Sequence, residues 1–285
     1  MLTFGKMMLP LAGIALLLSS CSKEEVQEAT ITAESVEAIF TTRSQETTRA
    51  TGNRWEAGDL IGIFALREGM PLSTDAVYDA KANIAYENNV DGTSGLFTPA
   101  MTPIRFPADG SAIDFVAYYP YSTAVSSDYQ LAIDLSQQTP LSAIDLMYAT
   151  ATGQTKANPS VPLTFTHSLS RFELTLTADE GLLLEGATLI IDNVLTEGSM
   201  NLATGTVTAG TTSSSITPVI SIDAANNRAV ATAILLPGQQ ADALSVQILL
   251  ADGKQYHWSP AAATLLSGKH YSYSLNLTAS VPGAE

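Results

Sequence analysis

This 285-residue chain has little of what many common activities require. Its single cysteine, Cys21, excludes an internal disulfide, a CxxC redox pair and a thiolate metal cluster. Its 13 basic residues are outnumbered by 28 acidic ones, giving a net charge of −15. Because phosphate binding needs clustered basic side chains, this balance argues against a nucleic-acid partner. Charged residues make up only 14% of the chain, against roughly 25% in ordinary soluble domains.

Catalytic and metal-binding signatures are also missing. The three histidines, His167, His257 and His270, lack the spacing of metal ligands on a helix, and no HExxH motif is present. We interpret His167 as a side chain that hydrogen-bonds to the backbone. The stretch 87–92 is similar to a calcium loop, but Thr98 stands where a bidentate Glu is needed, so we favour a polar hairpin. We therefore predict no enzyme activity, no catalytic residue, no metal and no cofactor.

The N-terminus, by contrast, carries an export signal. A basic residue, Lys6, precedes an apolar run over residues 7–18 that is too short to span a bilayer and fits a cleaved signal peptide. The run leads into Leu-Ser-Ser-Cys, which resembles the lipobox of lipoprotein precursors. We predict a signal peptide over residues 1–20 and acylation, including palmitate, at Cys21, which would anchor the protein in the outer membrane.

The residues after Cys21 indicate where that anchor is displayed. Lys23-Glu24-Glu25 resembles the signal that routes Bacteroidetes lipoproteins to the cell surface, although a charged tether would look similar. We expect a surface-exposed lipoprotein of the cell outer membrane. With so acidic a chain, the lipid and not attraction to anionic headgroups would hold it there.

From residue 29 onward, short β-like runs alternate with turn signals, which is typical of an all-β sandwich or barrel. Asp-Gly pairs at residues 91–92, 109–110 and 252–253 favour tight hairpins. The strands that we predict most clearly cover residues 29–41, 60–66, 112–119, 171–177, 187–192, 228–235, 244–250 and 271–278. In the last of these, Tyr271, Tyr273, Leu275 and Leu277 share one face.

Glycine, asparagine and prolines crowd residues 152–162 without a strand-like run, which suggests a domain boundary. We predict a tether and N-terminal strand over residues 21–49, one β-sandwich domain over 50–157 and a second over 158–285.

An aromatic run, Tyr118, Tyr119 and Tyr121 around Pro120, has two interpretations. The rings could form a platform for a sugar, with Trp55 and Trp258 as further candidates. Alternatively, they stand at a strand end, with alternate rings filling the core. We favour the second interpretation.

The stretch 41–59 is hydrophilic, rich in threonine and carries Arg43, Arg49 and Arg54. A polar loop with arginines is a natural substrate for a trypsin-like, Arg-specific protease, and the alternative is an uncut surface loop.

Several short motifs then follow in a characteristic order. They are Arg49-Ala50-Thr51 with Trp55, Gly58-Asp59 and Ile61-Gly62-Ile63, then the segments 115–120, 145–149, 163–171, 236–238 and 266–271. Their order and spacing resemble the Bacteroidetes fimbrillin superfamily, in particular its Mfa-like (minor-fimbrillin-like) branch. The resemblance covers nearly all of residues 21–277.

This resemblance implies two transthyretin-like β-sandwich domains in tandem and assembly with other fimbrillin subunits. It also implies that a protease cuts at Arg49, or second at Arg43, and removes the N-terminal strand. Another subunit's strand would then fill the exposed groove, in a fimbrium that serves adhesion to a host or bacterial surface glycan or protein.

The C-terminal segment departs from a stalk subunit, because Pro282 and Gly283 are poor material for a donor strand. The chain is therefore expected to be a tip, anchor or accessory fimbrillin, unless its last strand swings out as the donor. Two other functions stay open, a surface glycan-binding lipoprotein and an extracellular hydrolase with an unlocated carboxylate or serine site.

Overall fold

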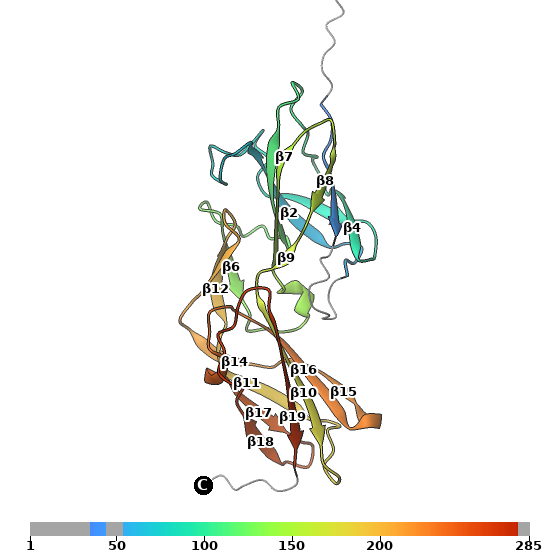
Figure 1. Ribbon diagram of the computed structural model, residues 1–285, viewed down its shortest axis with the longest axis vertical. Helices are drawn as coiled ribbons and strands as arrows, with labels where there is room; N and C mark the ends of the chain where they lie inside the picture. Colours follow the sequence, from blue (N-terminus) through green and yellow to red (C-terminus); the bar gives the residue numbers. More distant parts are fainter. Residues whose placement is uncertain (1–34, 44–53, 279–285) are drawn as a thin grey trace, which may run out of the picture. The chain divides into compact units, whose positions relative to one another are not determined.

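A computed structural model describes residues 35–43 and 54–278, and nearly all of its regular structure is β-strand (Figure 1). The helical segments of this part of the chain are three single 3-10 turns: η1 Leu141–Ala143, η2 Ala224–Asn226 and η3 Ala241–Ala243. The all-β prediction is therefore confirmed. The division into two tandem domains at residue 157 stays a prediction.

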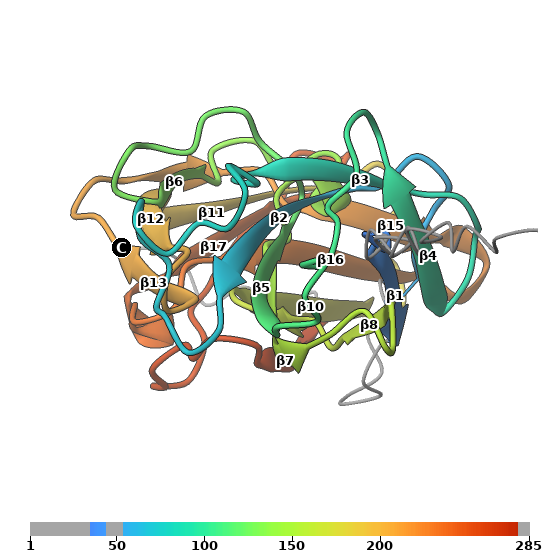
Figure 2. The same ribbon diagram turned by 90° about the horizontal axis from the view of Figure 1, so that it is seen from above.

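The largest sheet has eight strands in the order β8-β1-β4-β3-β2-β5-β7-β9. Their bounds are β1 Ile39–Arg43, β2 Leu60–Arg67, β3 Ile84–Asn88, β4 Ser94–Pro99, β5 Ile113–Tyr119, β7 Met147–Gln154, β8 Ser160–Leu163 and β9 Thr166–His167. Three strands separate β1 from β5 in this order, yet the rings of Phe40 and Phe115 lie 5.0 Å apart. The sheet therefore curves back over its own core, with β8 and β1 side by side (Figure 2).

Two four-stranded sheets, β15-β16-β10-β19 and β14-β11-β17-β18, form a β-sandwich later in the chain. Their bounds are β10 Ser170–Ala178, β11 Thr188–Leu195, β14 Ser213–Ile216, β15 Val219–Asp223, β16 Arg228–Leu235, β17 Ser245–Leu249, β18 Gln255–Trp258 and β19 His270–Leu277. Alternate residues of both sheets are buried in one apolar cluster, including Phe172 and Leu174 of β10 and Leu189 and Ile191 of β11. This alternation is what holds two sheets face to face.

A three-stranded sheet connects early and late parts of the chain. β6 (Gln130–Asp134) pairs with β12 (Glu197–Asn201), which pairs in turn with β13 (Thr206–Ala209). The apolar cluster at this sheet includes Phe64 of β2 and Val116 and Tyr118 of β5. β5 is consequently buried on both faces, which explains why the five consecutive residues 115–119 are all apolar or aromatic.

The strand predictions hold for most of the chain. The run 228–235 is β16, and β19 shows the predicted alternation, with Tyr271, Tyr273 and Leu275 packed against the core. The first strand differs in its bounds, because β1 runs from Ile39 to Arg43, and the predicted residues before 35 lie outside the described part. Two of the predicted Asp-Gly hairpins are found, at residues 91–92 between β3 and β4 and at residues 252–253 between β17 and β18. Residues 109–110 form a turn between β4 and β5, which do not pair, so the hairpin predicted there is wrong. Gly110 and Gly253 adopt a positive φ, at 84° and 88°, whereas Gly92 does not.

Candidate functional site

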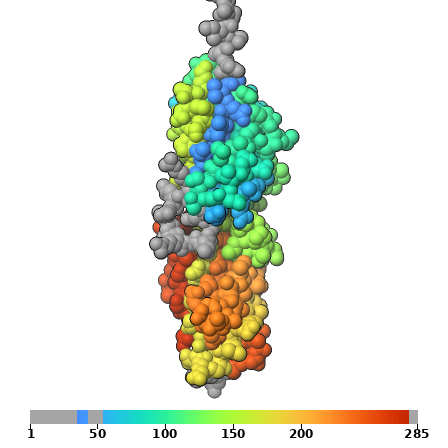
Figure 3. All heavy atoms as spheres, turned by 90° about the vertical axis from the view of Figure 1, so that its right-hand side faces the viewer, coloured from blue at the N-terminus to red at the C-terminus, as the bar shows by residue number. Residues whose placement is uncertain are grey.

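β1 lies between two strands that come from distant parts of the chain. It pairs antiparallel with β4, Phe40 opposite Phe97, and parallel with β8, Phe40 opposite Val161. In the space-filling view, the blue atoms of this segment reach the surface between β8 and β4 (Figure 3). We call the residues of β4, β8 and the core that contact β1 the β1 site.

Alternation along β1 decides which side chains enter the core. Ala38, Phe40 and Thr42 are buried, whereas Ile39 between them is 43% exposed. The Phe40 ring meets the rings of Tyr86 and Phe115 edge-on, with centroids 4.8 and 5.0 Å away. Such edge-to-face pairs add about 0.5–1.5 kcal/mol each beyond the burial of area. Phe40 is therefore the main anchor of β1.

Tyr86 contributes a ring to this core and a hydroxyl to its rim. Its Oη accepts a hydrogen bond from the Ile104 backbone N–H at 2.8 Å. Burial disfavours the phenolate and raises the pKa of Tyr86 to about 12, so the hydroxyl keeps its proton across the physiological range.

Thr42 supplies a polar contact at the other end of β1. Its Oγ1 accepts a hydrogen bond from the backbone N–H of Gly95 at 2.9 Å. A Cβ at residue 95 would lie 2.8 Å from that oxygen, so only glycine leaves room for this contact. No local sequence pattern marks this pair, since Gly95 and Thr42 are far apart in the chain.

The residues before β1 are held by the segment 104–106. The N–H of Ala38 donates to the Ile104 carbonyl at 2.9 Å, and the N–H of Phe106 donates to the Val36 carbonyl at 2.8 Å. Arg105 lies 3.6 Å from the Glu37 carboxylate, an exposed ion pair worth about 1 kcal/mol or less. Backbone pairing, more than charge, therefore fixes this end.

Residues 44–53 lie outside the described part of the chain, and the exposed Arg54 that follows them is succeeded by a buried tryptophan. Trp55 is 5% exposed, and its ring meets Phe97, Tyr119 and Phe165 at centroid distances of 5.0, 5.3 and 5.5 Å. Its backbone exchanges two hydrogen bonds with Gly92, at 2.7 and 3.0 Å. The chain is thus firmly attached directly after the exposed Arg54.

The next residues complete this attachment. Asp59 accepts hydrogen bonds from the Glu56 N–H at 2.8 Å and from the Tyr119 hydroxyl at 3.1 Å. Asp91 accepts the Ala57 N–H at 2.7 Å, and the buried Asn88 side chain donates to the Glu56 carbonyl at 2.9 Å. Burial raises the pKa of Tyr119, and the negative charge of Asp59 raises it further.

These contacts also account for the stretch that is similar to a calcium loop. Asn88 and Asp91 use their side chains to hold the segment after Trp55, as the polar-hairpin interpretation requires. Within residues 35–43 and 54–278, no group of three His, Cys, Asp or Glu side chains is placed to hold a metal ion. The same residues include no helix long and apolar enough to cross a bilayer.

The predicted processing residues lie at or beyond the edge of the described part. Arg43 ends β1, with its backbone opposite Ser94. Arg49 and Cys21 fall outside the described residues, so cleavage and lipidation stay predictions.

The aromatic run is a core element and not an open platform. Tyr118 is fully buried and Tyr119 is 8% exposed, and they belong to different apolar clusters because consecutive side chains of β5 face opposite ways. Tyr118 Oη donates to Asn83 at 2.7 Å. Only Tyr121 is partly exposed. The sugar-platform interpretation is therefore wrong for Tyr118 and Tyr119, whose ring faces are covered by protein.

Two motifs that are remote in sequence, 163–171 and 266–271, meet in one polar network. Ser267 Oγ donates to the Ser168 carbonyl at 2.9 Å, and the N–H of Gly268 donates to the Leu169 carbonyl at 2.9 Å. These contacts lead into the parallel pairing of β10 with β19, which begins at Arg171 opposite His270. Gly268 has a φ of +68°, and a Cβ there would lie 2.9 Å from the carbonyl oxygen of His167.

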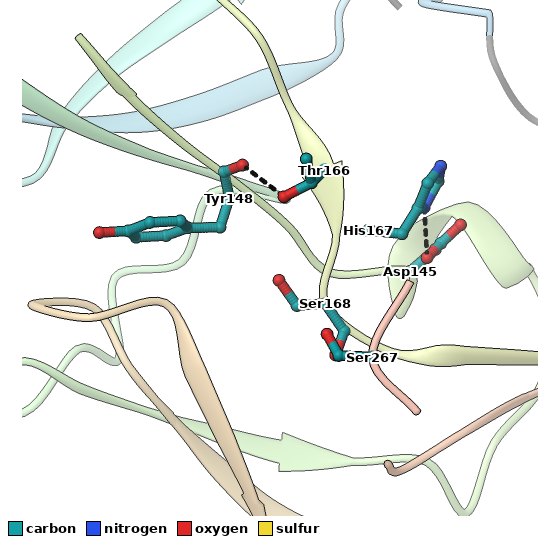
Figure 4. A network of polar contacts seen from close by, with 6 residues as sticks. All are labelled: Asp145, Tyr148, Thr166, His167, Ser168 and Ser267. Atoms are coloured by element: carbon teal, nitrogen blue, oxygen red, sulfur yellow. Dashed lines mark hydrogen bonds and ion pairs between the residues drawn. The ribbon is translucent and has the colours of Figure 1, made fainter. Parts of the chain in front are cut away.

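His167 faces a carboxylate in this network. Its Nδ1 lies 3.0 Å from Asp145 Oδ1 (Figure 4). The expected hydrogen bond to the backbone is thus replaced by one to a side chain, because η1 brings Asp145 to the start of β7, which pairs with β9. The hydrogen bond to Asp145 raises the pKa of His167, against the opposing effect of burial. Because the pair joins the segment after η1 to β9, we assign it a structural role.

The fold and the β1 site define an all-β protein of stacked and curved sheets, in which a short N-terminal strand completes the core. The chain belongs to the fimbrillin-like family, whose model matches residues 48–284. This confirms the resemblance found in the sequence.

Relatives agree with this assignment. A protein of Bacteroides uniformis, named as fimbrium subunit Fim1C, is 32% identical over 277 residues, covering 92% of this chain and 87% of the relative. A solved structure from Bacteroides uniformis ATCC 8492, whose name assigns it to cell adhesion, has a TM-score of 0.71 and 30% identity over 86% of this chain and 93% of its own. A similarly named structure from Bacteroides ovatus ATCC 8483 shares the fold, with a TM-score of 0.66, 22% identity, and coverage of 85% of this chain and 92% of its own.

Proposed function

We propose that this chain is a surface fimbrillin, a subunit or a tip or accessory component of a fimbrium that serves adhesion. It is exported by residues 1–20, lipidated at Cys21 and held in the outer membrane. An Arg-specific, trypsin-like protease then cuts at Arg49 or Arg43, β1 leaves, and a strand of another fimbrillin subunit takes its place. Membership of the fimbrillin-like family and the names of its relatives support this proposal.

The observation that carries the mechanism is the way β1 is attached. β1 is paired on both sides and fills the core with Phe40. Its covalent connection to the strands that follow it runs through residues 44–53, which carry Arg49. While the chain is intact, β1 is present at the high effective concentration of a tethered segment. A cut in residues 44–53 removes that advantage and makes β1 replaceable.

Loss of β1 would create an acceptor for a strand. The facing edges of β4 and β8 would lose their backbone partners, and the space beside Tyr86 and Phe115 would lose the Phe40 ring. Unpaired strand edges next to an apolar cavity favour the addition of a strand from another chain. Because these unpaired edges and this cavity would be exposed to water, the emptied site would tend to bind another strand.

The contacts of the described residues before and after residues 44–53 favour Arg49 over the other arginines. The backbone of Arg43 is paired with Ser94, and the residue after Arg54 is the buried Trp55, hydrogen-bonded to Gly92. Proteases need an accessible, extended backbone on both sides of the cut. We therefore expect the processed chain to begin at Ala50.

Limited digestion of the chain from Cys21 onward with a trypsin-like protease tests this proposal. Intact mass and N-terminal sequencing should give a new start at Ala50. If the last strand of the chain acts as the donor, incubation should then give oligomers that resist mild denaturant. A variant with both Arg43→Ala and Arg49→Ala should not be cut between β1 and Trp55 and should stay monomeric. Fimbriae whose subunits all still begin at Cys21 would sink the mechanism.

A further inference from the structure

We infer that the emptied β1 site selects its occupant by sequence. It takes a strand of another fimbrillin-like subunit that presents a small residue, an aromatic ring and a threonine or serine at alternate positions, running in the direction of β1. This inference rests on the proposed function, because β1 must first leave.

The central position requires a ring. Phe40 has no exposed surface, and its edge-on contacts with Tyr86 and Phe115 use a space bounded by two other aromatic side chains. An occupant with a short side chain here would leave a cavity in a close-packed core. We therefore expect Phe, with Tyr as the nearest substitute, at this position.

The first position requires a small side chain. Ala38 is 1% exposed, its N–H donates to the Ile104 carbonyl, and the N–H of the next residue, Ile39, donates to the Pro159 carbonyl. Because the backbone is held on both sides of Ala38, it cannot move outward to make room for a larger group. A leucine at this position would overpack the core.

The third position requires a hydroxyl. The Gly95 N–H donates to Thr42 Oγ1, and both residues are buried, with Thr42 only 1% exposed. Valine has nearly the shape of threonine but cannot accept this hydrogen bond, so it would leave the N–H unpaired. Serine would keep the contact.

Side chains at the positions between these three face outward, as the 43% exposure of Ile39 shows. They therefore contribute little to the choice of occupant. The order of the three pockets also sets the direction of the strand. A reversed occupant would place its hydroxyl near residue 38 and its small residue beside Gly95, where the N–H would lack an acceptor. The direction of β1, parallel to β8 and antiparallel to β4, is therefore part of the selection.

A peptide with the sequence of residues 35–43 tests the selection. The trypsin-cut chain is separated from its released segment, and binding of the labelled peptide is measured by fluorescence anisotropy. The parent peptide should bind, and its Phe40→Ala form should bind on the order of 100-fold more weakly. The Thr42→Val, Ala38→Leu and reversed-sequence peptides should bind at least about 10-fold more weakly. The matched outward change, Ile39→Ser, should alter binding by no more than about 3-fold.

The outcomes separate the two proposals. If the chain is cut and β1 stays bound, so that no peptide enters, the proposed function and the inference fall together. If all peptides, including the Phe40→Ala and reversed forms, bind alike, strand exchange survives and the inference is overturned.

A second measurement avoids the protease. In the full, uncut chain the Phe40→Ala change weakens the resident β1, and the parent peptide should then enter in trans and raise Tm. The wild-type chain should show no such rise. A Phe40→Ala chain that is folded by circular dichroism but does not respond to the parent peptide would also overturn the inference.

Discussion

The side-chain amide of Gln138 pairs with both backbone groups of Ile234, as a residue of a neighbouring strand would. Gln138 Oε1 accepts the Ile234 N–H at 2.8 Å, and Nε2 donates to the Ile234 carbonyl at 3.1 Å and to the Leu135 carbonyl at 2.8 Å. Gln138 is 3% exposed and follows β6, whereas Ile234 belongs to β16. A single side chain thus substitutes for a strand beside β16.

Replacing Gln138 with Ala should destabilise the protein by about 2–3 kcal/mol, because the backbone groups of Ile234 stay buried and lose their partners. Urea unfolding monitored by tryptophan fluorescence measures the loss. The adjacent Gln137 is exposed, so Gln137→Ala is the matched control and should change the free energy of unfolding by less than about 0.5 kcal/mol. Equal effects of the two changes would contradict the role assigned to Gln138.

Thr42→Val should cost about 1–3 kcal/mol, although the side chain keeps its shape, because the buried Gly95 N–H loses its acceptor. Thr41→Val, on the opposite side of β1, is the matched control and should be nearly neutral. Chemical denaturation of the uncut chain compares them. A Thr42→Val protein as stable as the wild type would mean that water replaces the hydroxyl.

Trp55→Ala should open a second cleavage site. Without the ring held by Phe97, Tyr119 and Phe165, the segment after Arg54 loosens and a trypsin-like protease can cut before residue 55. Mass spectrometry of a digestion time course should show the additional product. Trp258→Ala, which alters the partly buried tryptophan of β18, should leave the cleavage pattern unchanged, and the same pattern in both variants would refute the protective role of Trp55.

The contribution of the pair His167 and Asp145 to stability should depend on pH. The hydrogen bond to Asp145 raises the pKa of His167 in the folded protein above its ordinary value of 6.5. The pair therefore stabilises the fold fully below about pH 6.5 and loses that effect as pH rises through the folded pKa. The Tm difference between wild type and His167→Asn should be larger at pH 5.5 than at pH 8.5.

Burial lowers the pKa of His270, so its contribution to stability changes with pH in the opposite direction. Because that contribution is present in both proteins, it cancels when the Tm difference between wild type and variant is compared. Asp145→Asn should abolish the same pH dependence. His257→Asn, at an exposed position of β18, is the control and should leave it intact. A pH-independent effect of His167→Asn would show that the imidazole acts by packing alone.

Strand positions were predictable where one face is buried and the other is polar. The alternation of tyrosines and leucines against serines and Asn276 predicts β19 by itself. The run 228–235 is apolar apart from Arg228 and Thr232, and it predicts β16, most of whose residues are buried on both faces. The motifs 163–171 and 266–271 are recognisable as family features in the sequence. Their mutual contact is not predictable, because pairing between remote segments leaves no local periodicity.

Contacts made by single side chains with remote backbone groups escaped prediction. Nothing in the local sequence distinguishes the buried Gln138 from the exposed Gln137, or the inward Thr42 from the outward Thr41, until the register of their segments is known. The aromatic run was ambiguous for the same reason. Tyr118 and Tyr119 become core residues only because β5 is covered on both faces.

The place of β1 in the sheet also bears on how the protein folds. β1 precedes the other described strands in the chain, yet Phe40 pairs with Phe97 and with Val161, which follows more than a hundred residues later. Contacts of such large sequence separation form slowly, because the chain between them must first be ordered. The earliest described strand is thus expected to be among the last to find its neighbours. A nearly folded species with this place empty would then occur in the life of every molecule, before any protease acts.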